Sequence, residues 1–242
     1  MPLRSQRSSA CSSAAADNAQ VPPELAPTAA RASAGTCEPV MHVHELGSGT
    51  ALAGQPEAQA ALRVAARAQL GTVDAFISHS WHDDAQQKFD AVQAWRARFV
   101  NAHGREPTVW FDALCIDQDN VQPQLASLPI YLAGCKTVLA LAGPTYFQRL
   151  WCVLELHIFH QMGGSIEQIH FVPLETVAPT AGDVGAEEAA NEAAVFDVRC
   201  AVATDPLDEL RLLAVIEGSG EGIAAFNSWV RTTLMSAAKV RH

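Results

Sequence analysis

Residues 73–81 have the sequence VDAFISHSW, and this stretch decides the fold. The run from Val73 to Ser78 is short and mainly apolar, which is typical of a strand buried in a sheet. Ser80 and Asp83 follow with the spacing of a capping box, with Asp in place of Glu or Gln. They are predicted to begin a helix that ends at 101–104. Apolar residues recur at helical spacing in it, at Ala85, Phe89, Val92, Trp95 and Phe99.

The alternation of strand and helix continues to residue 174. Further strands are predicted at 107–111, 136–142 and 169–174. Helices are predicted at 124–133, shortened or kinked by Pro129, and at 146–162, closed by Gly163-Gly164. Strands that alternate with helices through short loops indicate a flavodoxin-like α/β fold, a parallel sheet with helices on both faces. The loops after Ser78, Phe111 and Ala142 should then share the edge where such folds bind ligands.

The two ends of the chain differ from this central part. Residues 1–50 are predicted to be a disordered tail, because 1–36 are rich in Ala, Ser and Pro. The arginines of 1–36 leave open a weaker alternative, an organellar targeting segment. An Ala-rich helix is predicted at 58–70. The α/β domain should span 51–176, and 177–242 should form an acidic, mainly helical extension, with helices from Asp205-Pro206 to Glu217 and over 223–238.

Composition excludes several classes of protein. The 242 residues carry 16 Lys and Arg against 26 Asp and Glu, a net charge of −10, which disfavours nucleic acid and anionic lipid as general partners. No apolar run approaches the roughly 20 residues that cross a bilayer. Six scattered cysteines without a CxxC pair indicate reduced thiols in a cytoplasmic protein. Walker, GxGxxG and GxSxG motifs are absent.

Residues 79–84, HSWHDD, contain donor types that suit a metal ion. No second cluster with clear spacing accompanies them, because His42 and His44 lie in a predicted loop. The predicted helix start already accounts for part of the segment. The acids of the loop 112–123 lack the EF-hand pattern and are predicted to be solvated. We therefore predict no metal site.

The predicted helix at 146–162 contains one acid, Glu155, in an almost wholly apolar stretch, LWCVLELHIF at 150–159. Trp151 lies four residues earlier and shares its helix face. A carboxylate in apolar surroundings is costly unless it has a partner or a chemical role. Both a structural and a functional Glu155 remain open on this pattern. Cys152 is predicted to be an inert thiol, because it sits in the same apolar helix.

Three segments resemble Toll/interleukin-1 receptor (TIR) domains. DAFISHSW at 74–81 resembles their first strand and loop, and TVWFDALCIDQ at 108–118 resembles their second. Tyr146 followed by WCVLEL at 151–156 is similar to the Y-x4-W-C-x-x-E-L helix of plant-type members. The resemblance covers about residues 73–175. The WFDALCIDQ segment also resembles the fungal heterokaryon-incompatibility domain, a class with a cell-death role.

The resemblance implies a signalling protein, in immunity or cell death, that either cleaves NAD or only self-associates. In enzymatic members an acid matching Glu155 is essential for breaking the nicotinamide–ribose bond, and NAD is then substrate rather than cofactor. Homo-oligomers, and partners among other TIR-like proteins, are expected in either case. The residues expected to bind substrate are Trp151, Ser78, His79, Ser80, Trp81, Asp112 and Tyr146.

Two departures from the family pattern favour the non-catalytic alternative. The serines common between the family's Tyr and Trp are replaced by Gln148 and Arg149. The loop after Phe111 lacks the glycine that is usual in signalling members. Fold alone does not choose between the enzyme and the scaffold. The pair Trp151 and Glu155 favours the enzyme.

Overall fold

The computed structural model describes residues 37–43, 66–69, 71–111, 127–174 and 195–239. Four neighbouring parallel strands make up most of a six-stranded sheet: β3 (Val73–His79), β4 (Thr108–Trp110), β5 (Cys135–Ala142) and β6 (Ile169–Pro173). Their spatial order is β4-β3-β5-β6. Among these four, β4 follows β3 in the chain but lies on the side of β3 away from β5. This is the flavodoxin-like order, and its direction of winding reverses between β3 and β5. The predicted strands and fold class are confirmed.

Two antiparallel strands extend the sheet beyond β4. These are β1 (Cys37–His42), which pairs with β4, and β2 (Ala66–Gln69), which pairs with β1. The prediction of a disordered tail to residue 50 was therefore wrong at 37–42, and that of a helix over 58–70 was wrong at 66–69. Pairing within the sheet, of β1 with β4 and of β2 with β1, decides the conformation here, because backbone hydrogen bonds to a formed sheet outweigh weak local propensity. Residues 1–36 and 58–65 lie outside the described residues.

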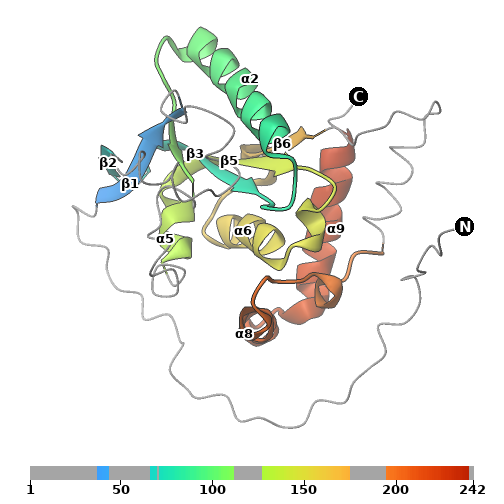
Figure 1. Cartoon of the computed structure of the whole chain (residues 1–242). Coiled ribbons are helices and arrows are strands. Elements are labelled where there is room, and N and C mark those ends of the chain that lie inside the picture. Colours follow the sequence, from blue (N-terminus) through green and yellow to red (C-terminus); the bar gives the residue numbers. More distant parts are fainter. Residues whose placement is uncertain (1–36, 44–65, 70, 112–126, 175–194, 240–242) are drawn as a thin grey trace, which may run out of the picture. The chain divides into compact units, whose positions relative to one another are not determined.

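Helices cover both faces of the sheet, as predicted (Figure 1). Successive side chains of β3 alternate between the faces, as a pleated strand requires. Ala75 and Ile77 pack against Val92 and Trp95 of α2 (Ala85–His103). Phe76 belongs to the opposite core, which α5 (Leu128–Ala133) and α6 (Leu150–Gln161) cover. β3 and most of β5 are thus buried on both sides, which explains their mainly apolar sequences.

Helix α2 begins four residues later than the capping box predicted, because that spacing made Ser80 the N-cap. Its N-cap is Asp84, whose side chain accepts a hydrogen bond from the Gln87 amide at 2.8 Å. Ser80 and Asp83 do not cap the helix, because their side chains bond across the sheet edge to Thr145. The predicted end is confirmed at Gly104, whose φ of 68° is a left-handed conformation that glycine adopts without strain.

The helix predicted over 146–162 is interrupted. A 3-10 helix, η3 (Tyr146–Gln148), is followed by Arg149 in extended conformation and then by α6. The interruption has a partner in the C-terminal part of the chain. The Val202 amide donates to the Gln148 carbonyl at 2.9 Å, and the Leu150 amide donates to the Val202 carbonyl at 3.0 Å. The end of α6 is as predicted, with Gly163 at a φ of 99°.

The C-terminal helices pack on α6 rather than standing apart. Helix α8 (Pro206–Gly218) begins with Asp205 as N-cap and Pro206 in its first turn, as predicted, and α9 (Gly222–Lys239) matches the second predicted helix. Phe226 and Val230 of α9 form a core with Leu150 and Val153 of α6. Within the residues described, no helix combines the length and apolarity needed to cross a membrane.

Candidate functional site

The candidate site lies at the carboxyl ends of β3 and β5, where the sheet's winding reverses. In parallel sheets this crevice is where ligands bind. The structure brings Ser78, Tyr146 and Glu155 together there, from β3, η3 and α6. These residues are 68 and 77 positions apart in the chain, and only the parallel topology makes them neighbours.

The Glu155 carboxylate is held by a chain of two hydroxyls. The Ser78 hydroxyl donates to Glu155 Oε2 at 2.5 Å. Tyr146 Oη lies 2.6 Å from Ser78 Oγ. Because the single hydroxyl hydrogen of Ser78 goes to the carboxylate, Tyr146 must be the donor in this second bond. The two hydrogen bonds therefore point in one direction: Tyr146 donates to Ser78, and Ser78 donates to Glu155.

The protonation of Tyr146 agrees with this direction. Its side chain is fully buried, and burial raises its pKa well above the usual value. Neighbouring Cys152 and Glu155 raise the pKa further. The phenol thus keeps its proton and remains a donor. Ser78 is likewise 0% exposed, so both residues support Glu155 from inside the fold rather than line the surface.

Trp151 occupies a position between two cores. Its half-buried ring packs against the core beneath the sheet and against the core shared by α6 and α9. This contact gives Trp151 a role in core packing. It also ties the helix that carries Glu155 to the C-terminal helices.

An aromatic group lies on the β3 side of the site. His79, which is 6% exposed, has its ring 4.7 Å from Trp81 and 4.9 Å from Phe111. Trp81 itself is 40% exposed, so it does not simply cover the core. Ser80 is buried and bonds to Thr145 Oγ1 at 2.7 Å. Asp112, the remaining predicted site residue, lies outside the described residues.

Lys88 is a buried cation that the sequence analysis did not single out. Its side chain is fully buried, and its ammonium donates to the Ser80 carbonyl at 2.9 Å. The same nitrogen lies 3.4 Å from His79 Nδ1. The signal was present in the sequence, because position 88 falls on the apolar face of α2 between Ala85 and Val92. A lysine in that register has to reach a polar group.

The described residues contain no group of three or more His, Cys, Asp or Glu placed to hold a metal ion. Within the HSWHDD segment, Asp83 turns to Thr145 and Asp84 caps α2. Cys152 is buried, and its thiol donates to the His79 carbonyl at 3.3 Å. A buried thiol used in this way is an inert one.

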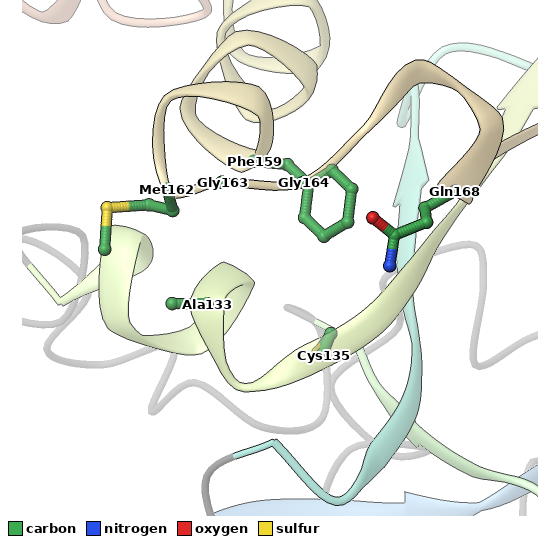
Figure 2. A pocket seen from close by; sticks show the side chains of 7 residues that line it. All are labelled: Ala133, Cys135, Phe159, Met162, Gly163, Gly164 and Gln168. Carbon is green, nitrogen blue, oxygen red and sulfur yellow. The ribbon is translucent and has the colours of Figure 1, made fainter.

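A shallow pocket of about 160 Å³ lies at the opposite end of the sheet, where β5 begins (Figure 2). Figure 2 shows the side chains of Phe159, Met162 and Gln168 around it. None of the predicted site residues lines this pocket, so it is distinct from the candidate site. Its lining residues are Ala133, Cys135, Phe159, Met162, Gly163, Gly164 and Gln168.

No family model matches the sequence, and no curated protein matches it. The structure defines a flavodoxin-like α/β protein with C-terminal helices. Its chemistry has to be inferred from the side chains at the sheet edge.

Proposed function

We propose that this chain is a TIR-like signalling protein that cleaves the nicotinamide–ribose bond of NAD with Glu155. One observation carries the proposal. A carboxylate stands at the reversal point of a parallel sheet, oriented by a directed pair of hydroxyls from Tyr146 and Ser78. Functional carboxylates need such fixed orientation, and two of the segments that resemble the family, 74–81 and 146–156, contribute its residues.

The reaction suits a single carboxylate. Breaking an N-glycosidic bond develops positive charge on the ribose, as in glycoside hydrolysis. Glu155 stabilises that charge or orients the ribose hydroxyls. At about 4 Å and an effective dielectric constant of about 20, the attraction is on the order of 4 kcal/mol. This corresponds to roughly a thousandfold in rate. The leaving nicotinamide departs neutral and needs no general acid.

The exposed ring of Trp81 supports the same assignment. It stands beside His79 and Phe111 on the β3 side of the site. A partly exposed aromatic ring at the end of β3 can stack on a planar ring of the substrate. We assign Trp81 to substrate binding, and Ser78 and Tyr146 to the support of Glu155.

The alternative is a non-catalytic self-association module. The observation that favours it is the apolar surface of the C-terminal part. Val202, Leu207, Leu210 and Val215 are each at least 44% exposed, and three of them lie on α8. Exposed apolar groups of this kind are typical of protein contact surfaces. In addition, Gln148 and Arg149, which replace the family's serines, bond to Val202 and Thr204 of the same part.

The test is nicotinamide release from NAD by the purified full chain at high protein concentration. We expect release by the parent and a loss of at least a hundredfold in Glu155→Ala. Glu167→Ala is the matched control, because this exposed acid lies in η4 (Ile166–Gln168), before the amino end of β6. Circular dichroism should show that all three proteins are folded.

The outcomes separate the two functions. Release that depends on Glu155 and not on Glu167 supports the enzyme. No release by a folded, self-associating parent contradicts it and supports the scaffold. Release that survives Glu155→Ala would contradict the role given to this carboxylate. Specific activity that rises with protein concentration would show that association and turnover are coupled.

A further inference from the structure

A second carboxylate at the same sheet edge has no part in the proposed reaction. Asp83 is only 7% exposed. Its Oδ1 accepts the Thr145 amide at 3.0 Å and the Thr145 hydroxyl at 2.8 Å. Its Oδ2 is buried and has no hydrogen-bond partner among the described residues. A buried carboxylate with one hydrogen-bonded oxygen and one unsatisfied oxygen costs folding free energy. The presence of Asp83 at this place therefore suggests a role for it.

The bonds around Asp83 have a fixed direction. An ionised carboxylate only accepts, so the Thr145 hydroxyl donates to Asp83. Ser80 Oγ, 2.7 Å from Thr145 Oγ1, must then be the donor in that pair. Ser80 Oγ in turn accepts the His82 amide at 3.2 Å. This second directed chain joins the β3–α2 loop to the turn after β5, alongside the one that ends on Glu155.

Gly143 shows how closely the two loops are fitted. A Cβ added to it would lie 2.4 Å from Cγ and from Oδ2 of Asp83. Contacts that short do not occur, so a side chain at 143 would force the carboxylate away from Thr145. The absence of a side chain at Gly143 is thus a requirement of the Asp83 contact. The turn after β5 and the loop between β3 and α2 therefore pack together in this way only with glycine at position 143.

The contact also fixes the neighbours of both partners. Thr145 immediately precedes Tyr146, which donates to Ser78, and Ser78 donates to Glu155. Ser80 is held from the other side by Lys88, which donates to its carbonyl. Releasing Thr145 would therefore loosen the start of η3 and with it the position of the Tyr146 hydroxyl. The loop from β3 would remain attached through Lys88.

We propose that Asp83 is a positioning residue. By fastening Thr145, it keeps the Tyr146–Ser78 chain in register with Glu155. The proposal rests on the proposed NAD cleavage for its effect on rate, and on the fold alone for its effect on structure. Asp83 does not touch substrate in this account.

The experiment compares Asp83→Ala, Asp83→Asn and Asp84→Ala in the full chain. Asp84 is the matched control, because it is the adjacent acid and caps only α2. Two readouts are used: hydrogen exchange of the Thr145 amide, and kcat and KM for NAD. In Asp83→Ala we expect Thr145 exchange at least tenfold faster and kcat about tenfold lower, with KM within threefold. A tenfold change corresponds to about 1.4 kcal/mol, which is within the range for a typical intramolecular hydrogen bond.

Asp83→Asn should recover most of both effects, because its amide oxygen can still accept from Thr145. Asp84→Ala should leave Thr145 exchange and kcat within threefold of the parent. A merely structural role for Asp83 would lower the amount of folded protein in both Asp83 variants. It would not produce rescue by Asn together with an exchange change centred on Thr145.

Each outcome decides a separate point. Unchanged Thr145 exchange in Asp83→Ala overturns the proposal. Faster exchange with an unchanged kcat overturns the positioning role. If the parent releases no nicotinamide, the proposed function fails, while the exchange result still decides whether Asp83 holds Thr145. If Asp83→Ala does not fold, Thr145→Val removes the hydroxyl that donates to Asp83 and accepts from Ser80, and keeps the Thr145 amide bond to Asp83. It should lower kcat threefold to tenfold, and a kcat equal to that of the parent overturns the proposal.

Discussion

Asp74 and Glu155 are carboxylates at opposite ends of the same parallel sheet, and they are held in different ways. Asp74 accepts from Arg105 at 2.6 and 2.7 Å and from Lys136 at 3.0 Å, so two cations neutralise it. Glu155 is oriented by the Ser78 hydroxyl, with Tyr146 behind it. Hydroxyl groups orient a carboxylate without neutralising its charge. The comparison sets an acid paired with two cations, which joins the strands, against an acid held by a pair of hydroxyls, to which we assign the proposed chemistry.

The pKa of Asp74 reflects its role in the fold. Burial would raise it, but the hydrogen bonds from Arg105, from the Thr108 amide and from Lys136 together hold it well below its usual range. Thr108 begins β4 and Lys136 lies near the start of β5, so one carboxylate joins three neighbouring strands. Carboxylates with perturbed pKa values occur in structural networks as well as in active sites. The groups that bond the carboxylate distinguish these two cases.

The largest effect on stability is expected for Asp74→Asn. The change removes the charge that Arg105 and Lys136 neutralise and places an amide among their donors. Both cations are about half-exposed and regain water, which limits the loss to about 2–3 kcal/mol. Urea unfolding at pH 7 measures it. A loss below about 0.5 kcal/mol would show that the Asp74 network does not stabilise the sheet.

Low pH should reduce the contribution of Asp74 to the free energy of unfolding. Because its folded pKa is depressed, its contribution to stability is fully present above the unfolded value of 3.8 and is lost as pH falls below that value. The difference in unfolding free energy between the parent and Asp74→Asn should therefore shrink as the pH falls from about 4 to about 2. A difference that stays constant over this range would contradict the assigned cause.

A smaller effect is expected for Tyr146→Phe. This change removes the hydroxyl that donates to Ser78 while keeping the buried ring. Loss of one buried hydrogen bond should cost about 1 kcal/mol of stability. Because Ser78 can still donate to Glu155, NAD cleavage should fall threefold to tenfold rather than disappear. A loss as large as that of Glu155→Ala would mean that Tyr146 acts on substrate directly.

The smallest effect concerns His157, where α6 meets α9. Its ring lies 4.6 Å from Phe226 and 5.2 Å from Trp229, and its Nδ1 has no partner among the described groups. Burial lowers its pKa from 6.5, His160 lowers it further, and Glu221 opposes the shift. The unfolded chain therefore binds the proton more readily, and stability should fall as pH drops below 6.5.

His157→Phe should remove this part of the pH dependence. Between pH 7.5 and pH 5.5, the parent should lose no more than about 1 kcal/mol of unfolding free energy beyond the loss in His157→Phe. The pKa of His170 is also lowered by burial, so some dependence of the same sign should remain. Thermal unfolding across the pH range measures it. An unchanged slope would exclude His157 as a source.

The strands and helices around the site could be predicted from the sequence because their patterns are local. β3, β5 and α2 carry apolar runs or helical periodicity over 7, 8 and 19 residues. β1 and β2 could not, because strands of 6 and 4 residues gain their stability from partners distant in sequence. The family resemblance pointed to Glu155. The direction of its hydrogen bonds depended on the distances to Ser78 and Tyr146.

Asp83 shows the limit of local reasoning most clearly. Its spacing from Ser80 suggested a helix start, whereas its partner, Thr145, is 62 positions away. Arg149 is a similar case, because it lies inside the helix predicted over 146–162 and yet is extended beside Val202. In both cases a contact from another part of the chain overrides a favourable local pattern. Lys88, in contrast, gave a local signal by its place on an apolar helix face.

The most direct test of the account is a paired measurement on Asp74→Asn and Glu155→Gln. For each protein, NAD cleavage per folded molecule and the free energy of unfolding are measured under the same conditions. We expect Glu155→Gln to lose at least a hundredfold in cleavage with stability within about 1 kcal/mol of the parent, because its amide oxygen still accepts from Ser78. Asp74→Asn should lose stability and keep cleavage within threefold. Equal cleavage by the parent and Glu155→Gln would contradict the account.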